Sequence, residues 1–305
     1  MSQMLSPIEE LMNKKLGATF HRFVLAKNGN KILMRKLKEV LSIEIRTMLE
    51  RSGMTTPPFD PFSIKMVGKA KIHVEFVSGK KIRGDGVMEI CSDGFLIKID
   101  DNLKRQLARH RLRSTMAHEL MHTFFYDVKR LPPAKLGHIS QSRKHFLMEE
   151  ELCHFLAREF LVPTFPLLDL IAQKKSLKAP SIRNMEFLKR TFVVSSDIMA
   201  YRIISDLTIW NAMFIKFVKE RNYFRAKTRL KNKINRSYKK VKLPTHVPLE
   251  FSTAWAILLS NHVQNAANLG RIEELFRLNG QMLALESLVE TQNPVSIMTL
   301  IYEID

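Results

Sequence analysis

Two histidines are spaced so that a helix would bring them to one side, and a glutamate directly follows the first of them. The residues are His118, Glu119 and His122, in the order H-E-x-x-H, and side chains four residues apart share a helical face. Both imidazoles can therefore reach one zinc ion. Glu119 is turned by about 100° around the helix from His118, which places its carboxylate beside the metal, where it can take a proton from a zinc-bound water. The pattern predicts a zinc-dependent hydrolase with Glu119 as general base.

A catalytic zinc site needs a third protein ligand, and a carboxylate on a neighbouring helix would supply it. Glu149, Glu150 and Glu151 follow the motif after a loop. Glu150 shares its helical face with the small residues Cys153 and Ala157, which would let the two helices approach closely. Glu151 points away from that face. Spacing alone leaves both Glu149 and Glu150 open as the ligand.

The segments around these residues have the patterns of an α+β protein. Apolar residues three or four apart predict helices over residues 32–51, 112–126 and 146–161. Residues 71–77 and 95–99 are predicted strands, and the glycines between them, Gly86 included, are interpreted as turn positions. The motif therefore lies on a well-patterned helix that follows a strand-rich stretch.

Two blocks of sequence carry a resemblance to a known family. Residues 111–122 read R-L-R-S-T-M-A-H-E-L-M-H, and residues 150–163 read E-E-L-C-H-F-L-A-R-E-F-L-V-P. They are similar to the R-x-R-F-T-x-A-H-E-L-G-H and E-x-x-[AC]-N-x-x-A-x-x-L-L-x-P blocks of the ImmA/IrrE metallopeptidases. Ser114, Met121 and His154 stand where that family has Phe, Gly and Asn, and these departures remove neither a ligand nor the base.

The resemblance implies a zincin-like core, in which the ligand helices pack against a small sheet, with Glu150 as the third ligand of Zn²⁺. It also implies a regulatory endopeptidase that cleaves, or promotes cleavage of, a helix-turn-helix transcriptional repressor in a stress response. His154 lies one helical turn from Glu150. It is an outer partner of the site, a competing ligand or a surface histidine.

Three further residues near the motif are candidates for substrate contact. Arg111 and Arg113 could bind a substrate carbonyl or carboxylate, but arginines in such positions more commonly pair with nearby acids. Tyr126 could stabilise an oxyanion, although packing is the commoner role for such a residue. We expect structural roles for all three.

The remainder of the chain is expected to form two further parts. We predict a metallopeptidase domain over residues 1–175, a helix-turn-helix-like segment over 176–211 and a basic mixed module over 212–305. In the middle part, residues 182–207 resemble two short helices with a break at 193–196, where Ser195 or Ser196 would cap the second helix. In the last part, residues 261–267 are predicted to be helical, and residues 282–288 and 296–304 have strand-like patterns. This part is expected to serve as a sensor or a docking surface.

The basic charge of the chain suggests a second class of function. The net charge is +19, and residues 216–242 contain twelve Lys or Arg residues against one acid, Glu220. Such a run favours non-specific DNA contact, and a solvated hairpin or helix face is the plainer interpretation. The alternative function is a nucleic-acid-binding regulator that uses a zinc-peptidase-like fold without hydrolysis. The intact Glu119 counts against that alternative, because a binding module needs no general base.

Composition bears on the compartment in which the protein works. Cys91 and Cys153 are the only cysteines and lie far apart in the sequence, which suits a reducing environment better than a disulfide framework. No run of about 18 apolar residues predicts a membrane span. We therefore expect a cytoplasmic protein.

Overall fold

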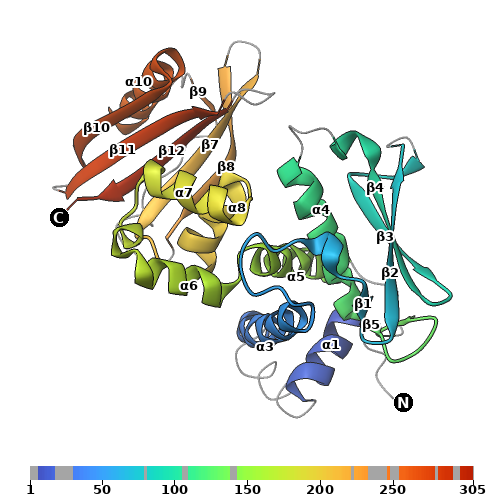
Figure 1. Ribbon diagram of the computed structural model, residues 1–305. Coiled ribbons are helices and arrows are strands. Elements are labelled where there is room, and N and C mark those ends of the chain that lie inside the picture. Colours follow the sequence, from blue (N-terminus) through green and yellow to red (C-terminus); the bar gives the residue numbers. More distant parts are fainter. Residues whose placement is uncertain are drawn as a thin grey trace. The chain divides into compact units, whose positions relative to one another are not determined.

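The computed structural model describes residues 6–17, 30–78, 81–104, 109–137, 143–220, 223–232, 246–247, 254–278, 281–290 and 296–304. The chain is a mixed α+β protein that divides into two compact units, Met1–Pro163 and Thr164–Asp305 (Figure 1). The predicted boundaries near residues 175 and 211 differ from this division. The difference arises because residues 164–211 pack with the strands of the second unit, as described below.

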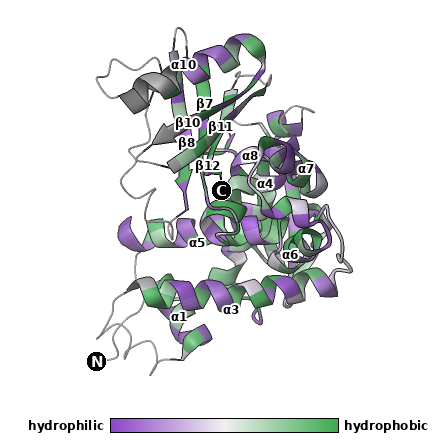
Figure 2. Cartoon of the chain, turned by 90° about the vertical axis from the view of Figure 1, so that its left-hand side faces the viewer, coloured by the Kyte–Doolittle hydropathy of each residue, from purple (hydrophilic) through white to green (hydrophobic). Residues whose placement is uncertain are grey.

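The helices of the first unit have apolar faces that pack together. Those helices are α1 (Pro7–Leu16), α3 (Asn30–Arg51), α4 (Arg109–Met121) and α5 (Arg143–Leu161). Hydrophilic and hydrophobic residues alternate along α1 and α3 (Figure 2). In α3 the spacing of three or four places Leu33, Leu37, Leu41, Ile45 and Leu49 in the core. The helices predicted over residues 32–51 and 146–161 are therefore confirmed.

A small sheet completes the first unit, with the strand order β1-β2-β4-β3. Its strands are β1 (Met66–Val67), β2 (Ala70–Val77), β3 (Gly86–Cys91) and β4 (Gly94–Asp100). Strands β2 and β4 are parallel, and the other pairs are antiparallel. Phe95, Ile97 and Ile99 alternate along β4 as buried residues, and α4 packs against β3 and β4. Strand β3 lies at the edge of this sheet, next to the helix that carries the motif.

The motif helix ends earlier than the sequence pattern predicts. Helix α4 stops at Met121, and a 3-10 turn over His122–Phe125 continues it into β5 (Tyr126–Asp127), which pairs with β6 (Ala134–Lys135). The loop expected between the motif and the acidic helix covers residues 129–142, of which residues 138–142 lie outside the described residues. Further 3-10 turns in this unit cover Pro61–Ser63 and Asp101–Lys104.

Short helices lead into the second unit. They are α6 (Thr164–Gln173), a 3-10 turn (Lys175–Lys178), α7 (Ile182–Phe192), α8 (Ser196–Ala200) and a π-helical stretch (Tyr201–Asp206). The predicted break is confirmed: Val193 has a left-handed backbone with φ of 52°, and the Ser195 hydroxyl accepts a hydrogen bond from the Ile198 N–H. Arg202 is fully buried in the π-helical stretch.

The second unit is built on an antiparallel sheet with the order β10-β11-β12-β7-β8-β9. Its strands are β7 (Ala212–Glu220), β8 (Tyr223–Lys231), β9 (His246–Val247), β10 (Arg271–Leu278), β11 (Gln281–Glu290) and β12 (Ser296–Glu303), and helix α10 (Ala254–Leu269) joins β9 to β10. The predicted helical and strand segments of this part are confirmed as α10, β11 and β12.

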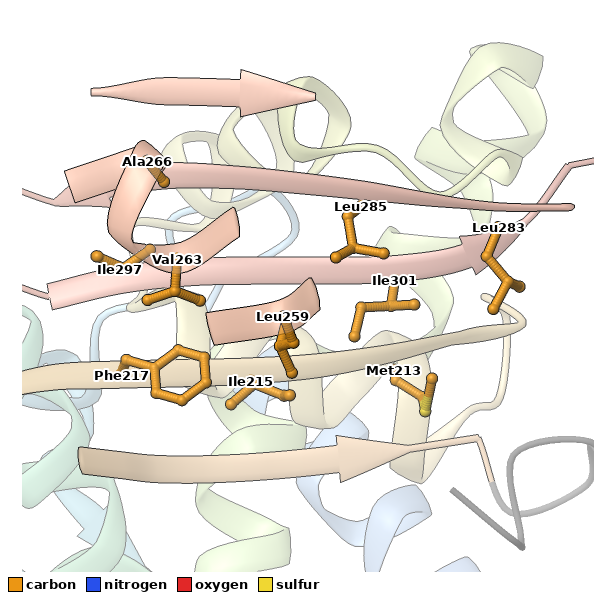
Figure 3. Close-up of a cluster of buried hydrophobic side chains, with 10 residues drawn as sticks. All are labelled: Met213, Ile215, Phe217, Leu259, Val263, Ala266, Leu283, Leu285, Ile297 and Ile301. Carbon is orange, nitrogen blue, oxygen red and sulfur yellow. The ribbon is translucent and has the colours of Figure 1, made fainter. Parts of the chain in front are cut away.

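The two faces of this sheet pack against different helices. Leu259, Val263 and Ala266 of α10 cover one face, where they meet alternate residues of the central strands (Figure 3). The other face meets α7 and α8: the Ile182 N–H of α7 donates to Glu286 at 2.8 Å, and the Ser196 hydroxyl of α8 donates to Glu290 at 3.0 Å. The helix pair of residues 182–207 is therefore part of the sheet's packing in this unit. Within the described residues, no helix is both long and apolar enough to cross a bilayer.

Candidate metal centre

Helices α4 and α5 bring three potential metal ligands together in the first unit. The Nε2 atoms of His118 and His122 lie 3.3 Å apart. The Glu150 carboxylate lies 3.3 Å from Nε2 of His118 and 3.5 Å from Nε2 of His122. The three side chains offer ligand atoms that all fall within 4.8 Å of one another. Two of them come from one helix and the following turn, and the third comes from the neighbouring helix.

Close packing of the two helices sets this geometry. Met116, Leu120 and Met121 of α4 are fully buried, as are Cys153 and Leu156 of α5. The small Cys153 side chain, predicted to allow close approach, has its sulfur 3.5 Å from Nδ1 of His122. Burial raises the pKa of the Cys153 thiol, which keeps the sulfur neutral and makes it a packing group here.

The structure separates the two acids that spacing left open. Glu150 faces the Nε2 atoms of both histidines, whereas Glu149 lies 3.2 Å from Nδ1 of His122, on the other side of that ring. Glu149 is 3% exposed and also lies 3.5 Å from the Lys135 ammonium. An N–H at Nδ1 that donates to Glu149 leaves the Nε2 lone pair of His122 free to bind an ion. Glu151 turns away, as expected, and pairs with Lys38 at 2.8 Å.

Charge around His122 favours a cation in this cluster. Burial by itself lowers the pKa of His122, but the hydrogen bond with Glu149 and the charges of Glu119 and Glu150 outweigh it, so the pKa is raised. The pKa of Glu150 is lowered, first by its hydrogen bond with His118 and also by the charges of the nearby histidines. The raised pKa of His122 reflects negative charge that a positive ion would neutralise, and the lowered pKa of Glu150 keeps its carboxylate ionised, the form that binds a cation.

Glu119 is held in a buried position beside the cluster. It is 9% exposed, and burial raises the pKa of its carboxylate, while the histidines and a hydrogen bond from the Met88 N–H act in the opposite direction. A methyl group added at Gly86 would lie 2.7 Å from Cγ2 of Thr115 and 3.0 Å from Cγ of Glu119. Strand β3 therefore approaches α4 so closely that it fixes where the Glu119 carboxylate can lie.

His154 packs on the cluster without joining its ligand set. Its ring lies 4.4 Å from the ring of His118, centroid to centroid. Although part of the side chain reaches solvent, burial of the rest and the charge of His118 lower the pKa of His154 to about 4. Among the described residues, Nδ1 of His118 is buried without a hydrogen-bond partner. The orientation of the His118 ring is therefore held by packing against His154, whereas that of the His122 ring is held by the Glu149 carboxylate.

The other candidates near the motif have structural partners. Arg111 binds Asp85, with 2.6 Å from a guanidinium nitrogen to Oδ1. Arg113 is buried and donates to the Phe59 carbonyl at 2.6 Å. Tyr126 packs edge-on against Phe95, with 5.2 Å between ring centroids, and burial raises its pKa. These contacts agree with the structural roles expected from the sequence.

Sequence reasoning missed the contribution of strand β3 and the second role of the acidic pair. Gly86 was interpreted as a turn residue, but it begins β3 and lies against Glu119. The Met88 N–H gives no sequence signal because every residue except proline has one. The adjacent pair Glu149-Glu150 did carry a signal, since neighbouring acids on a helix point in directions about 100° apart and can serve two different ring nitrogens.

The donor set fits a zinc ion by its chemistry. Two imidazole nitrogens and one carboxylate are the ligands of many catalytic zinc sites, which keep a further position open. The donors are close enough to bind one ion, and His122 has the outer carboxylate partner that metal-binding histidines normally have. His118, His122 and Glu150 are therefore a candidate metal-binding group.

Comparisons with known proteins give a distant likeness among solved structures. No protein-family model matches the chain, and no curated protein matches it. Among solved structures, a Mycobacterium tuberculosis transcriptional regulator is similar, at 10% sequence identity and a TM-score of 0.49, over 98% of this chain and 81% of that chain.

Proposed function

We propose that the protein is a zinc-dependent endopeptidase with a zincin-like core. The observation that carries the proposal is the meeting of His118, His122 and Glu150 within 4.8 Å, directly beside the buried carboxylate of Glu119. A metal site that served structure alone would have no need of a buried, unligated acid next to its ligands. That combination supports metal-assisted hydrolysis.

Each residue has a defined part in this reaction. His118, His122 and Glu150 would hold the ion, and Glu149 would fix the ring orientation of His122. Zinc bound there would supply a Lewis acid that polarises a scissile carbonyl and acidifies water. Glu119 takes a proton from the attacking water, for which its raised pKa makes it a stronger base. The same proton can then pass to the leaving amine as the C–N bond breaks.

An extended polypeptide is the substrate class that the surroundings of Glu119 support. Strand β3 is an edge strand, and edge strands offer free backbone groups to an added strand. The Met88 N–H on this strand reaches Glu119, so a peptide lying along β3 would place its carbonyls near the metal centre. A helix-turn-helix transcriptional repressor as the substrate, and hence a role in transcriptional regulation, rests on the sequence resemblance.

The proposal is tested by intact-mass analysis of helix-turn-helix repressors from the same genome after incubation with the zinc-loaded protein. Peptides from a digested proteome provide an unbiased second substrate. We expect discrete cleavage by the wild type, none with a chelator and strongly reduced cleavage with Glu119→Gln. Cleavage that persists equally in all three samples comes from a contaminant and would refute the proposal. Intact substrates in every sample would also count against hydrolysis.

Exposed cations on β8 favour a second function, contact with DNA. Lys227 and Arg229 are exposed and lie on one face of the strand, separated by the buried Thr228. Lys216, in the same basic run, is instead partly buried and forms ion pairs with Asp197 and Glu290, so the run is less uniformly solvated than its composition suggests. Residues 221–222 and 233–242 of the run lie outside the described residues.

Replacing Lys227 and Arg229 with Ser would test whether this strand recruits the enzyme to DNA. If it does, cleavage of a DNA-bound repressor should slow while cleavage of the free repressor stays unchanged. DNA affinity should also show a shallower dependence on salt, because fewer phosphate contacts remain. Equal rates on both substrates would leave the strand as a solvated basic surface.

A further inference from the structure

A second group of metal-ligand side chains lies on the small sheet of the first unit, apart from the centre described above. It consists of His73 on β2, Cys91 at the end of β3 and Asp93 in the turn before β4. His73 belongs to the exposed residues that alternate with the buried Ala70 and Ile72 along β2. The group therefore lies on the solvent side of the sheet.

His73 and Cys91 both contact Asp93. Nε2 of His73 lies 2.9 Å from Oδ1 of Asp93, and the Cys91 sulfur lies 3.5 Å from the same oxygen. The three potential ligand atoms fall within 4.8 Å of one another. In a tetrahedral zinc site, ligand atoms are about 3.3–3.7 Å apart, given bond lengths of about 2.0–2.3 Å. Small side-chain adjustments would therefore bring all three onto one ion.

The backbone fixes Asp93 in this position. The Lys71 N–H donates to the Asp93 carbonyl at 2.9 Å, which ties the β3–β4 turn to β2. A methyl group added at the next residue, Gly94, would lie 2.0 Å from the Lys71 carbonyl oxygen. Only glycine permits so close an approach of the two strands. The ligand atoms are thus brought together by the sheet itself, and little ordering would be needed on binding.

We propose that His73, Cys91 and Asp93 form a second, surface site for a divalent transition-metal ion of zinc-like softness. A thiolate, an imidazole and a carboxylate together suit such ions better than calcium or magnesium, which prefer oxygen ligands alone. The side chains of His73 and Asp93 are 46% and 38% exposed, so an ion can enter from solvent and a water can complete its coordination.

Lys71 sets the strength of this site. Its ammonium lies 3.1 Å from Oδ2 of Asp93, where it competes with a metal ion for the carboxylate and repels the ion's charge. The second site should therefore bind more weakly than the His118 centre. Replacing Lys71 with Ser should therefore tighten metal binding at the second site several-fold. If the cluster were only a surface ion pair, the same substitution would remove a partner of Asp93 and would not increase metal affinity.

Cobalt(II) titration of the full-length protein separates the two sites, because a thiolate bound to cobalt gives a near-ultraviolet charge-transfer absorption. The first centre, with nitrogen and oxygen donors, gives no such band. We expect the band in the wild type and in His118→Ala, a tighter titration in Lys71→Ser and loss of the band in Cys91→Ser. Cys153→Ser is the matched control and should keep it.

Two results would overturn the proposal. One is the absence of thiolate absorption from the folded wild type at saturating cobalt. The other is a band that survives in Cys91→Ser and disappears in Cys153→Ser, which would assign the sulfur ligand to the first centre. His73→Ala and Asp93→Asn should each weaken cobalt binding at the second site, and unchanged affinity in both would also contradict it. Circular dichroism of each variant checks that the fold is retained.

Discussion

Glu149 contacts His122 at the ring nitrogen opposite the one that faces Glu150, so the two neighbouring acids have different roles. The Glu149 carboxylate lies 3.2 Å from Nδ1 of His122, while Glu150 lies 3.5 Å from Nε2 of the same ring. Glu149 therefore orients the imidazole through Nδ1, and Glu150 lies on the Nε2 side, where a metal ligand is expected. This arrangement distinguishes residues that differ by one position in the sequence and are identical in type.

Substitution of the acids on α5 should separate these roles. Glu149→Ala should weaken zinc binding by about 10–100-fold, as expected for an outer partner, and Glu150→Ala should weaken it more because it removes a direct ligand. Glu151→Ala, at the acid that pairs with Lys38, is the matched control and should change nothing. Competition with a zinc chelator measures all three, in a Cys91→Ser background that silences the second site. A larger loss in Glu149→Ala than in Glu150→Ala would reverse the assignment.

The proposed general base should be separable from metal binding. Glu119→Gln keeps an oxygen that can accept the Met88 hydrogen bond, so we expect an unchanged fold and retained zinc. Hydrolysis should fall by about 10²–10⁴-fold, the usual contribution of general base catalysis. Glu119→Asp keeps a base at a shorter reach and should give an intermediate rate. Near wild-type hydrolysis by Glu119→Gln would exclude this residue as the base.

Gly86→Ala should impair catalysis from outside the ligand set. The added methyl group would press on Glu119 and Thr115, and misplacing a catalytic group by about 1 Å can cost on the order of 10²-fold in rate. Zinc affinity should stay near that of the wild type. Adding Thr115→Ala removes the nearest clashing atom and should restore part of the activity. If the double variant is no faster than Gly86→Ala, the crowding argument fails.

The second unit should lose stability in acid through Glu290. Burial alone would raise the pKa of this carboxyl, but the ammonium groups of Lys216 at 2.7 Å and Lys189 at 2.9 Å outweigh it and lower the pKa to about 2. A carboxyl whose pKa is lower in the folded state stabilises the fold above its unfolded pKa and loses this effect as the pH falls. The free energy of unfolding should therefore drop by roughly 3 kcal/mol between about pH 4.5 and pH 2.

Urea unfolding followed by tryptophan fluorescence measures this effect in the second unit alone, because Trp210 and Trp255 both belong to it. Glu290→Gln should be less stable at neutral pH, since the partly buried ammonium groups of Lys189 and Lys216 lose a negative partner. Its stability should also vary less between about pH 4.5 and pH 2. Glu273→Gln, at an exposed position of β10, should keep the wild-type dependence. Parallel pH profiles for the wild type and Glu290→Gln would contradict the assignment.

The sequence by itself determined the features that depend on neighbours within a few residues. The spacing of His118 and His122 places both rings on one side of a helical turn, and the structure retains this although the α-helix becomes a 3-10 turn at His122. Apolar periodicity located α3 and α5, and the pair Ser195-Ser196 identified the start of α8, where the structure selects Ser195 as the cap. Such features follow from helical geometry and from hydrogen bonds inside one turn, which the local sequence specifies.

Only the tertiary structure decided which distant segments meet. It separated Glu150 from Glu149 through the packing of α4 on α5, and it placed Gly86 of β3 against Glu119. It also joined residues 164–211 to the C-terminal sheet, where the Lys216 ammonium pairs with both Asp197 and Glu290. These relationships depend on long-range packing and on strand pairing. They cannot be predicted from spacing along the chain, because residues far apart in sequence become neighbours only when the whole core forms.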